Sequence, residues 1–220
     1  MAEKLLYPHV DVVELRMTRH SVPKAAVGRK IRETAPPHIR FAVEMPSAFF
    51  EGPEKNAKLG GDLSRYGQFQ TTDEQKRLFE RLNRFADNLE SDTLVLLTPA
   101  AFTPTPKMQE ILATFLSAMP IEGRTIVWQP SGPWTETQTQ SFAKSHQLVL
   151  AVDPLRDDIP AGPVAYLRLG PFAAMGSRVG VYDLERIVEA AAPFETATVV
   201  FGTDRALDDV RNLKQVAAER

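Results

Sequence analysis

Short apolar runs alternate with amphipathic stretches along most of this 220-residue chain. The apolar runs are rich in β-branched residues, as is typical of strands that are covered on both faces. This alternation predicts stacked βα units that form a parallel sheet, with any site on the loops that follow the strands. We expect strands near Val10–Leu15, Ile39–Glu44, Thr93–Thr98, Arg124–Gln129, Gln147–Val152, Pro163–Arg168 and Ala197–Phe201.

Helix start signals stand between the predicted strands. Thr72 with Gln75, and Thr135 with Gln138, have the spacing of a capping box, in which two side chains satisfy free N–H groups of the first turn. Each box precedes apolar residues at helical spacing, so it indicates an amphipathic helix. Other helices are expected to begin between Thr105 and Pro106, near Tyr182 or Asp183, and near Thr203 or Asp204.

Two segments interrupt the alternation. The segment from Met45 to Thr71 is longer than most loops of compact domains and carries Phe49, Phe50 and Tyr66. It is equally consistent with a surface insertion and with a lid, which would place these aromatic side chains over the site. The other interruption is the segment from Gly170 to Gly180. No domain boundary is visible, so we expect a single domain over residues 1–220.

Composition narrows the class of protein. Lys and Arg number 26 against 28 for Asp and Glu, so the net charge does not favour nucleic acid as a partner, and a local basic patch is the alternative. The absence of cysteine excludes disulfides, thiolate nucleophiles and cysteine metal sites. No apolar run approaches the roughly 20 residues of a membrane helix, and Tyr7-Pro8-His9 interrupts the start where a signal peptide would be apolar. We therefore expect a cytoplasmic protein with no membrane partner.

Several strand-end motifs occur in a fixed order. They are Val12-Val13-Glu14, Phe41-Ala42-Val43-Glu44, Leu96-Leu97-Thr98-Pro99-Ala100-Ala101-Phe102, Leu150-Ala151-Val152-Asp153 and Tyr166-Leu167-Arg168-Leu169-Gly170. Together they resemble the YecE-like family (domain of unknown function seventy-two), whose usual forms are TVE, FAVK, QLPP-x-F, LVLAD and Y-x-RLHG. The resemblance covers the chain from about Leu5 onward. It implies a TIM-barrel-like fold, and the family's biochemical activity is not established.

The chain also departs from the family's pattern. The family's first strand, which contains glycine and tryptophan, has no counterpart here, so we expect about seven parallel strands. Arg16 stands where the family has asparagine, and Glu44 stands where it has lysine. Of the family's EFRH-x-SW segment only Trp134 is kept, and the histidine of RLHG is deleted after Arg168. These losses favour a relative that has lost the family's activity.

The carboxyl ends of barrel strands meet at one mouth, and charged side chains stand at several of these ends. Glu14, Glu44 and Asp153 could supply a general acid and base. Arg16 and Arg168 could hold a carboxylate or phosphate group through the planar guanidinium. The commoner role of such charges is to pair with one another, and this alternative stays open.

Further candidates for substrate binding follow the later strands. They are Gln129, Trp134, Ser177 and Arg178. Ser177 and Arg178 would bind phosphate together with Gly176, although a flexible turn is the commoner role of such a loop. Trp128 and Trp134 could stack on a ring or sugar, but large aromatic side chains more often complete a core.

No cofactor or metal is expected, because no two histidines have the spacing of a zinc motif. A metal site of Glu14, Glu44, Asp153 and His20 is the less favoured alternative.

Two classes of function remain open, and whether the protein is an enzyme is undecided. The favoured class is a diverged, non-catalytic barrel that binds a small anionic ligand or a protein. The alternative is a hydrolase or isomerase that acts on a small phosphorylated or sugar-like substrate, or on a phosphoester. A barrel without its first strand has open edges at Val10–Leu15 and Ala197–Phe201, and such edges invite a protein partner or self-association.

Overall fold

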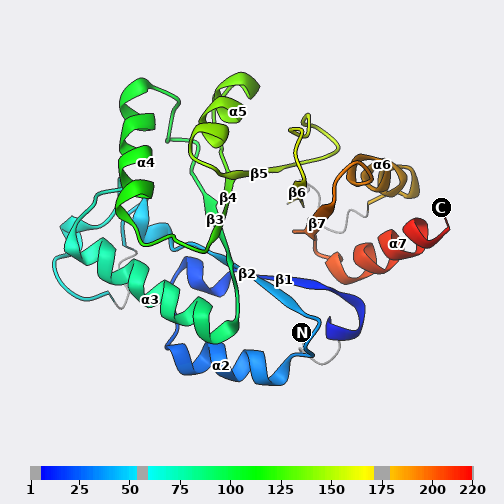
Figure 1. Cartoon of the computed structure of the whole chain (residues 1–220), viewed down its shortest axis with the longest axis horizontal. Coiled ribbons are helices and arrows are strands. Elements are labelled where there is room, and N and C mark those ends of the chain that lie inside the picture. Colours follow the sequence, from blue (N-terminus) through cyan, green and yellow to red (C-terminus); the bar gives the residue numbers. More distant parts are fainter. Residues whose placement is uncertain (1–5, 54–58, 171–178, 220) are drawn as a thin grey trace. The chain divides into compact units, whose positions relative to one another are not determined.

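The computed structural model describes residues 6–53, 59–170 and 179–219 (Figure 1). The chain divides into two compact units, each described by itself. The larger unit is Val12–Leu148. The smaller unit combines Met1–Asp11 with Val149–Arg220. A single domain over the whole chain stays a prediction.

The larger unit is built on four parallel strands with the order β1-β2-β3-β4. Its helices follow the strands along the chain, and short 3₁₀ turns join them. The strands are β1 (Val12–Leu15), β2 (Arg40–Glu44), β3 (Thr93–Leu97) and β4 (Thr125–Gln129). The helices are α2 (Ala25–Thr34), α3 (Asp73–Leu89), α4 (Pro106–Ala118) and α5 (Glu136–Ser145), with 3₁₀ turns η2 (Met17–Arg19), η3 (Ser47–Phe49) and η4 (Leu63–Arg65).

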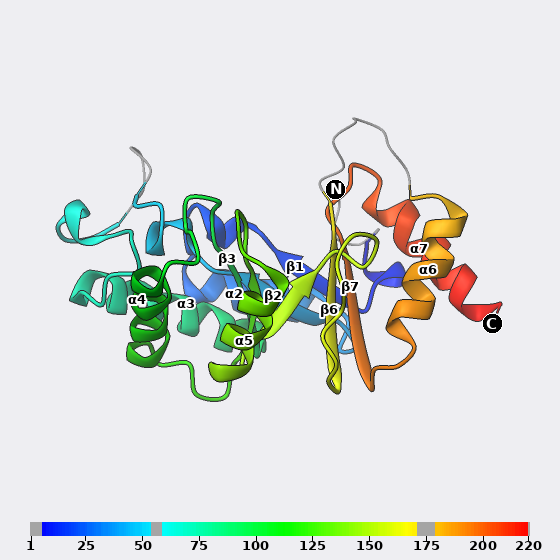
Figure 2. The ribbon, with the colours of Figure 1, turned by 90° about the horizontal axis from the view of Figure 1, so that it is seen from above.

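The smaller unit contains three parallel strands in the order β5-β6-β7. These are β5 (Val149–Val152), β6 (Val164–Leu169) and β7 (Thr196–Phe201), with helices α6 (Val181–Ala191) and α7 (Ala206–Ala218) and the 3₁₀ turn η1 (Tyr7–His9). The two helices lie side by side along β6 and β7 (Figure 2). An ion pair of 2.8 Å between Lys214 Nζ and Asp11 Oδ2 fixes the N-terminal segment to α7.

The fold is a TIM-barrel-like α/β fold with seven strands, and this confirms the predicted fold class. The strands follow one another in sequence order, and every described pair is parallel. Each predicted strand is present, with ends that differ by at most two residues. The repeated connection from one strand through a helix to the next parallel strand explains why the alternation in the sequence was informative.

The predicted helix caps are partly confirmed. Thr135 and Gln138 form the expected capping box, and Thr72 accepts a hydrogen bond from the N–H of Gln75. The predicted start of α7 was wrong, because that helix begins only at Ala206. The hydroxyl of Thr203 instead donates to Oδ2 of Asp209 at 2.6 Å, and the N-cap residue is Arg205, whose side chain makes no capping hydrogen bond.

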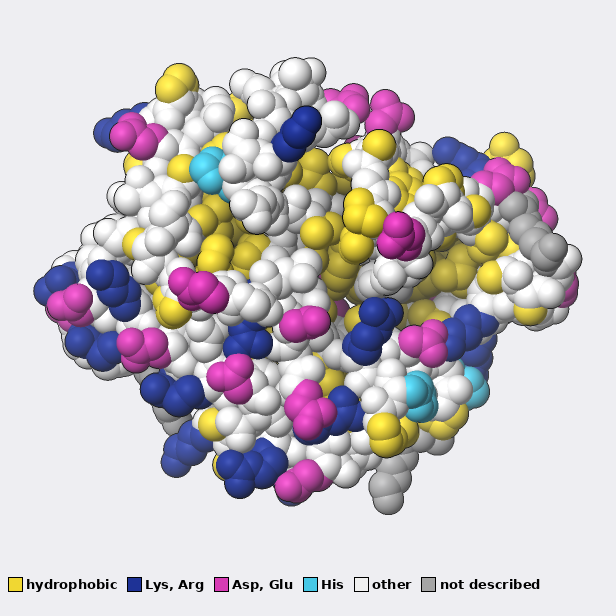
Figure 3. All heavy atoms as spheres, in the orientation of Figure 1, with side chains coloured by type: hydrophobic (Ala, Val, Ile, Leu, Met, Phe, Trp, Pro, Cys, Tyr) yellow, Lys and Arg dark blue, Asp and Glu magenta, His cyan; other side chains and the backbone are white. Residues whose placement is uncertain are grey.

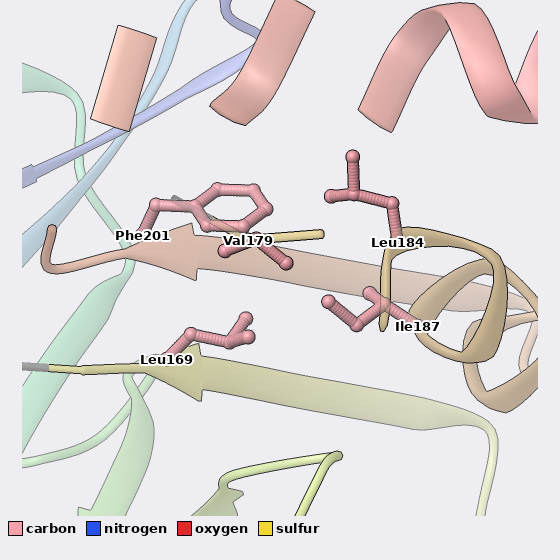
Figure 4. Packing of buried hydrophobic residues seen from close by; sticks show 5 residues of the cluster. All are labelled: Leu169, Val179, Leu184, Ile187 and Phe201. Atoms are coloured by element: carbon pink, nitrogen blue, oxygen red, sulfur yellow. The ribbon is translucent and has the colours of Figure 1, made fainter. Parts of the chain in front are cut away.

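In each unit, alternate strand residues pack against the helices. In the larger unit, Phe41, Val43, Leu94, Leu96 and Trp128 share one face of the sheet by register, and all are buried. In the smaller unit the side chains of Leu169, Val179, Leu184, Ile187 and Phe201 point toward one another and form the buried cluster (Figure 4). Burial of each such side chain contributes roughly 1.5–3 kcal/mol. The opposite face of the larger unit's sheet carries Glu44 together with the buried apolar side chains of Val95 and Val127.

The long segment at 45–71 also packs against the helices. The ring of Phe49 lies 5.7 Å from Phe79 of α3 and 5.3 Å from Phe115 of α4. The ring of Phe69 lies 5.2 Å from Phe115, and its N–H donates to the carbonyl of Phe49 at 2.8 Å. These contacts make Phe49 and Phe69 part of the packing against α3 and α4. Whether the segment acts as a lid or is a surface insertion stays a prediction.

Candidate functional site

The register of β1 and β2 brings Arg16 and Glu44 together. Glu14 pairs with Ala42 and Leu15 with Val43, so the residue that follows Leu15 lies beside Glu44. Side chains alternate between the two faces of a sheet, so Glu14 and Glu44 share the face opposite the helices. Through the pairs Glu44–Val95 and Leu97–Gln129, the side chain of Gln129 belongs to this face too.

Glu44 is a buried carboxylate with two guanidinium groups near it. Its side chain is 1% exposed. Its Oε2 lies 3.9 Å from Nε of Arg16, and its Oε1 lies 3.8 Å from Nη1 of Arg19. Burial of a carboxylate is costly unless opposite charges accompany it, and these two cations offset part of that cost. The predicted pairing of strand-end charges with one another is thus confirmed for Arg16 and Glu44.

The 3₁₀ turn η2 holds Arg19 in place. The buried hydroxyl of Thr18 donates to the carbonyl of Glu44 at 2.6 Å and lies 3.2 Å from that of Leu15. The hydroxyl of Ser47 donates to the carbonyl of Arg19 at 3.2 Å. These bonds fix the turn after β1 to the end of β2.

Sequence analysis missed Arg19. Its signal was its spacing of three residues from Arg16, because side chains three apart lie on the same side of a 3₁₀ turn.

Arg19 also reaches the segment that follows η3. Its Nη2 lies 3.9 Å from Oε1 of Glu51, whose side chain is 46% exposed. The side chain of Arg16 is 64% exposed. The carboxylate of Glu44 is therefore enclosed, while the outer parts of the cluster formed by Arg16, Arg19, Glu44 and Glu51 face solvent. We refer to these four residues as the Arg16/Arg19 cluster.

Trp134, a predicted ligand-stacking residue, belongs to an aromatic cluster. Its indole N–H donates to the carbonyl of Phe102 at 2.8 Å, and its ring stacks on Phe102 at an interplanar angle of 18°. Its edge meets Trp128 at a centroid distance of 5.0 Å. Both tryptophans thus contribute to packing, the second alternative that the sequence left open. A ligand contact of Trp134 stays a prediction.

In the smaller unit, Asp153 and Arg168 lie at the same end of the sheet. Val152 pairs with Leu167, so the residues that follow them are neighbours at the carboxyl ends of β5 and β6. Arg168 shares a face with Tyr166, opposite the helix-facing side chains of Leu167 and Leu169. Asp153 and Arg168 thus follow the carboxyl ends of neighbouring strands, as the sequence predicts. The convergence of Glu14, Arg16, Glu44, Asp153 and Arg168 at one mouth stays a prediction.

The carboxylate of Asp153 is engaged in the turn that follows β5. Its Oδ1 accepts a hydrogen bond from the N–H of Leu155 at 3.0 Å, and its Oδ2 lies 3.6 Å from Nε of Arg156. The N–H of Asp153 donates in turn to Oδ2 of Asp157 at 3.0 Å. Aspartate is favoured at such positions because its side chain bonds to the backbone two residues on.

Of the remaining candidates, Glu14 and Gln129 share the sheet face of Glu44. Ser177 and Arg178 lie outside the described residues. Among the described residues, no group of three or more His, Asp or Glu side chains is placed to hold a metal ion.

A groove of about 480 Å³ lies between α4 and α5, and the predicted site residues do not line it. Amide and hydroxyl side chains line it together with Glu110 and His146.

One face of the larger unit carries charges of both signs. Over α2 and α3, at the lower left of Figure 3, basic and acidic side chains are interspersed. This pattern agrees with the near balance of charge in the sequence. No helix in the described part of the chain is long and apolar enough to cross a membrane.

Successive parallel strands connected by helices place the chain in the class of TIM-barrel-like α/β proteins. Within that class the chain is similar to a DUF72 family protein of Enterococcus faecalis V583, seen in two crystal structures. At 3.10 Å resolution the TM-score is 0.70 with 12% identity, over 96% of this chain and 86% of the other. For the structure at 2.52 Å resolution the TM-score is 0.71 with 13% identity, over 98% of this chain and 94% of the other.

This likeness shows a shared fold over nearly the whole chain. Both of these structures are of a DUF72 family protein, the family that the strand-end motifs resemble; at this identity the likeness shows the fold alone. No protein-family model and no curated protein matches the sequence.

Proposed function

We propose that this chain is a diverged member of the YecE-like family that binds a small anionic ligand and does not catalyse a reaction. The observation that carries the proposal is the contact between Arg16 and Glu44, in which the carboxylate is enclosed and the guanidinium faces outward. A general acid or base must come within hydrogen-bond reach of the reacting group. An enclosed carboxylate that pairs with arginine is better suited to positioning that arginine.

Asp153 supports the same conclusion. One of its carboxylate oxygens accepts the N–H of Leu155 and the other faces Arg156, so the carboxylate stabilises a turn. Two of the three predicted acid–base residues thus have structural contacts that explain their presence without catalysis.

The departures from the resembling family point in the same direction. Arg16 and Glu44 stand where that family has asparagine and lysine, and in this protein they contact each other. A new arginine beside a new carboxylate keeps a positive group at the strand ends, although the lysine is gone. We infer that the arginine can bind an anion at a position where the family's own polar group is absent.

The proposal is tested by binding and turnover measurements on the whole chain. We expect inorganic phosphate, succinate or glucose 6-phosphate to raise the midpoint of thermal unfolding, because a ligand that binds only the folded state stabilises it by mass action. We expect no hydrolysis of glucose 6-phosphate or of p-nitrophenyl phosphate. Turnover that disappears in Glu44→Gln or Asp153→Asn, with folding intact, would overturn the proposal.

The alternative function, a hydrolase or isomerase, is favoured by one observation. Glu14, Glu44 and Gln129 share one face of the larger unit's sheet, near the carboxyl ends of their strands. Such a convergence is the usual arrangement of acid–base groups in α/β barrels. The turnover measurement above decides between the two functions. A protein partner and self-association at a strand edge stay predictions, as does a cytoplasmic location.

A further inference from the structure

Arg19 stands between two carboxylates that come from different parts of the chain. Its Nη1 lies 3.8 Å from Glu44 at the end of β2, and its Nη2 lies 3.9 Å from Glu51 after η3. The first carboxylate is buried and the second is half exposed. The two contacts therefore have different characters, one fixed within the protein and one at the surface.

The guanidinium groups of Arg16 and Arg19 can donate hydrogen bonds to a ligand. Their distances to the carboxylates, 3.8–3.9 Å, exceed the range of an N–H···O hydrogen bond. Among the described residues, neither Arg16 nor Arg19 donates a side-chain hydrogen bond. A guanidinium offers a planar fork of donors that matches a carboxylate or phosphate. Both arginines thus retain the donors that such a group requires.

The backbone beneath these arginines is held in place before any ligand binds. Thr18 bonds to the carbonyl of Glu44, and Ser47 bonds to the carbonyl of Arg19. A binding group that is already positioned loses less conformational entropy on association.

Glu51 is the changeable member of the cluster. Its ion pair with Arg19 is long and solvent-exposed, and such pairs contribute little to stability. Its N–H donates to the carbonyl of Ser47 at 2.8 Å, which keeps its backbone close to the arginine. The carboxylate is thus chemically similar to a ligand oxyanion and lies where one would bind.

We propose that Arg16 and Arg19 form an oxyanion subsite for a carboxylate or phosphate group, and that Glu51 competes with the ligand for Arg19. This inference rests on the proposed function and deepens it. Glu44, the buried member of the cluster, positions the two guanidinium groups. When an oxyanion binds, it replaces the exposed contact of Glu51, and the side chain of Glu51 turns to solvent. The affinity for the oxyanion then depends on how much more favourable its contact with Arg19 is than the contact of Glu51 with Arg19.

The experiment measures the affinity of inorganic phosphate and of succinate for the full chain by calorimetry, at constant ionic strength. The two probes separate a phosphate site from a carboxylate site. The key variant is Glu51→Gln, and Glu90→Gln is its matched control, because Glu90 forms a similar exposed pair 3.8 Å from Arg32. Both variants remove one negative charge, so a general effect of net charge appears equally in each.

We expect Glu51→Gln to tighten binding by about three- to tenfold, since it removes the internal competitor, and Glu90→Gln to leave it unchanged. Arg19→Lys keeps the charge but loses the planar fork, so we expect it to weaken binding by about tenfold. Circular dichroism and the unfolding midpoint establish that each variant is folded. Equal affinities of Glu51→Gln and Glu90→Gln, or unchanged binding by Arg19→Lys, would overturn the subsite.

The outcomes separate this inference from the proposed function. If phosphate or succinate binds but no variant changes the affinity, the subsite is wrong and the protein still binds anions. If neither probe binds to the wild type or to Glu51→Gln, the subsite is again wrong. Turnover of glucose 6-phosphate overturns the proposed function even where Glu51→Gln tightens binding.

Discussion

Arg16 and Glu44 are neighbours at the carboxyl ends of β1 and β2, where Nε of the arginine lies 3.9 Å from Oε2 of the glutamate. Each differs from the residue of the resembling family at its position. A buried glutamate is tolerated where arginine side chains lie beside it, and Arg16 is one of the two that lie beside Glu44. The pair of Glu44 with Arg19 has the same character and can be tested directly.

We expect Arg19 and Glu44 to be energetically coupled. Arg19→Met leaves the buried carboxylate with one cation fewer, and we expect it to lower the free energy of unfolding by about 1–3 kcal/mol. In Arg19→Met/Glu44→Leu the unpaired charge is gone, so the double variant should lose less than the sum of the single variants. Urea unfolding measures all three. Strict additivity would show that the two side chains do not interact.

The strand ends could be predicted because the apolar runs in the sequence mark where each strand begins and ends. Continuous apolar runs fixed the strands within two residues, and parallel strands place their carboxyl ends together. The neighbourhoods of Arg16 with Glu44, and of Asp153 with Arg168, followed from that rule. Arg19 was missed because its place depends on η2, a short turn whose hydrogen bonds reach across to Glu44 and Ser47.

The part that Asp153 plays in a turn could be predicted in part. Asp153-Pro154-Leu155 has the local signature of a turn in which aspartate bonds to the backbone two residues on. The packing of Phe49 and Phe69 could not be predicted from the sequence. The segment 45–71 has no regular period, so nothing in its local pattern distinguishes packing on α3 and α4 from packing over the strand ends.

We expect Asp153→Ala to destabilise the smaller unit. The substitution removes the acceptor of the Leu155 N–H, and the loss of such a bond costs about 0.5–2 kcal/mol. Asp157→Ala removes the acceptor of the Asp153 N–H and should cost a similar amount. Chemical unfolding measures both. Full stability of Asp153→Ala would contradict a structural role and strengthen the case for catalysis.

We expect Phe49→Ala to be among the most damaging substitutions in the larger unit. The side chain is fully buried and contacts the rings of Phe79 and Phe115, so truncation should cost about 3–5 kcal/mol. Leu63→Ala, in the same segment, is the control. Its side chain is 46% exposed, and we expect a change within about 0.5 kcal/mol. Equal effects of the two variants would show that the segment packs only loosely on the helices.

We expect Gly67→Ala to strain the same segment. Gly67 has φ of +85°, and a Cβ there would lie 2.9 Å from the backbone nitrogen of Gly52. The N–H of Gly67 also donates to the carbonyl of Ala48. Both the positive φ and the close approach favour glycine, so we expect a loss of about 1–3 kcal/mol in urea unfolding. Gly123→Ala is the matched control, because Gly123 has φ of +72° with no heavy atom near its Cβ position. A loss no larger than that of the control would mean that the segments around Gly52 and Gly67 can separate at little cost.

We expect the segment 45–71 to weaken in alkaline solution through Tyr66. Burial, and to a lesser extent the negative charge of Glu74, raise the pKa of the Tyr66 phenol above its ordinary value of 10.0. Its hydroxyl donates to the carbonyl of Gly60 at 2.8 Å, a bond that exists only in the protonated form.

A raised pKa of Tyr66 in the folded state means that the protonated phenol stabilises the fold. This contribution is complete below the unfolded pKa and is lost as pH rises through the folded one. The free energy of unfolding of the wild type should therefore fall above about pH 10, and that of Tyr66→Phe should fall less over the same range. Urea unfolding across this range measures the difference, and parallel curves for the two proteins would show that Tyr66 titrates as it does in the unfolded chain.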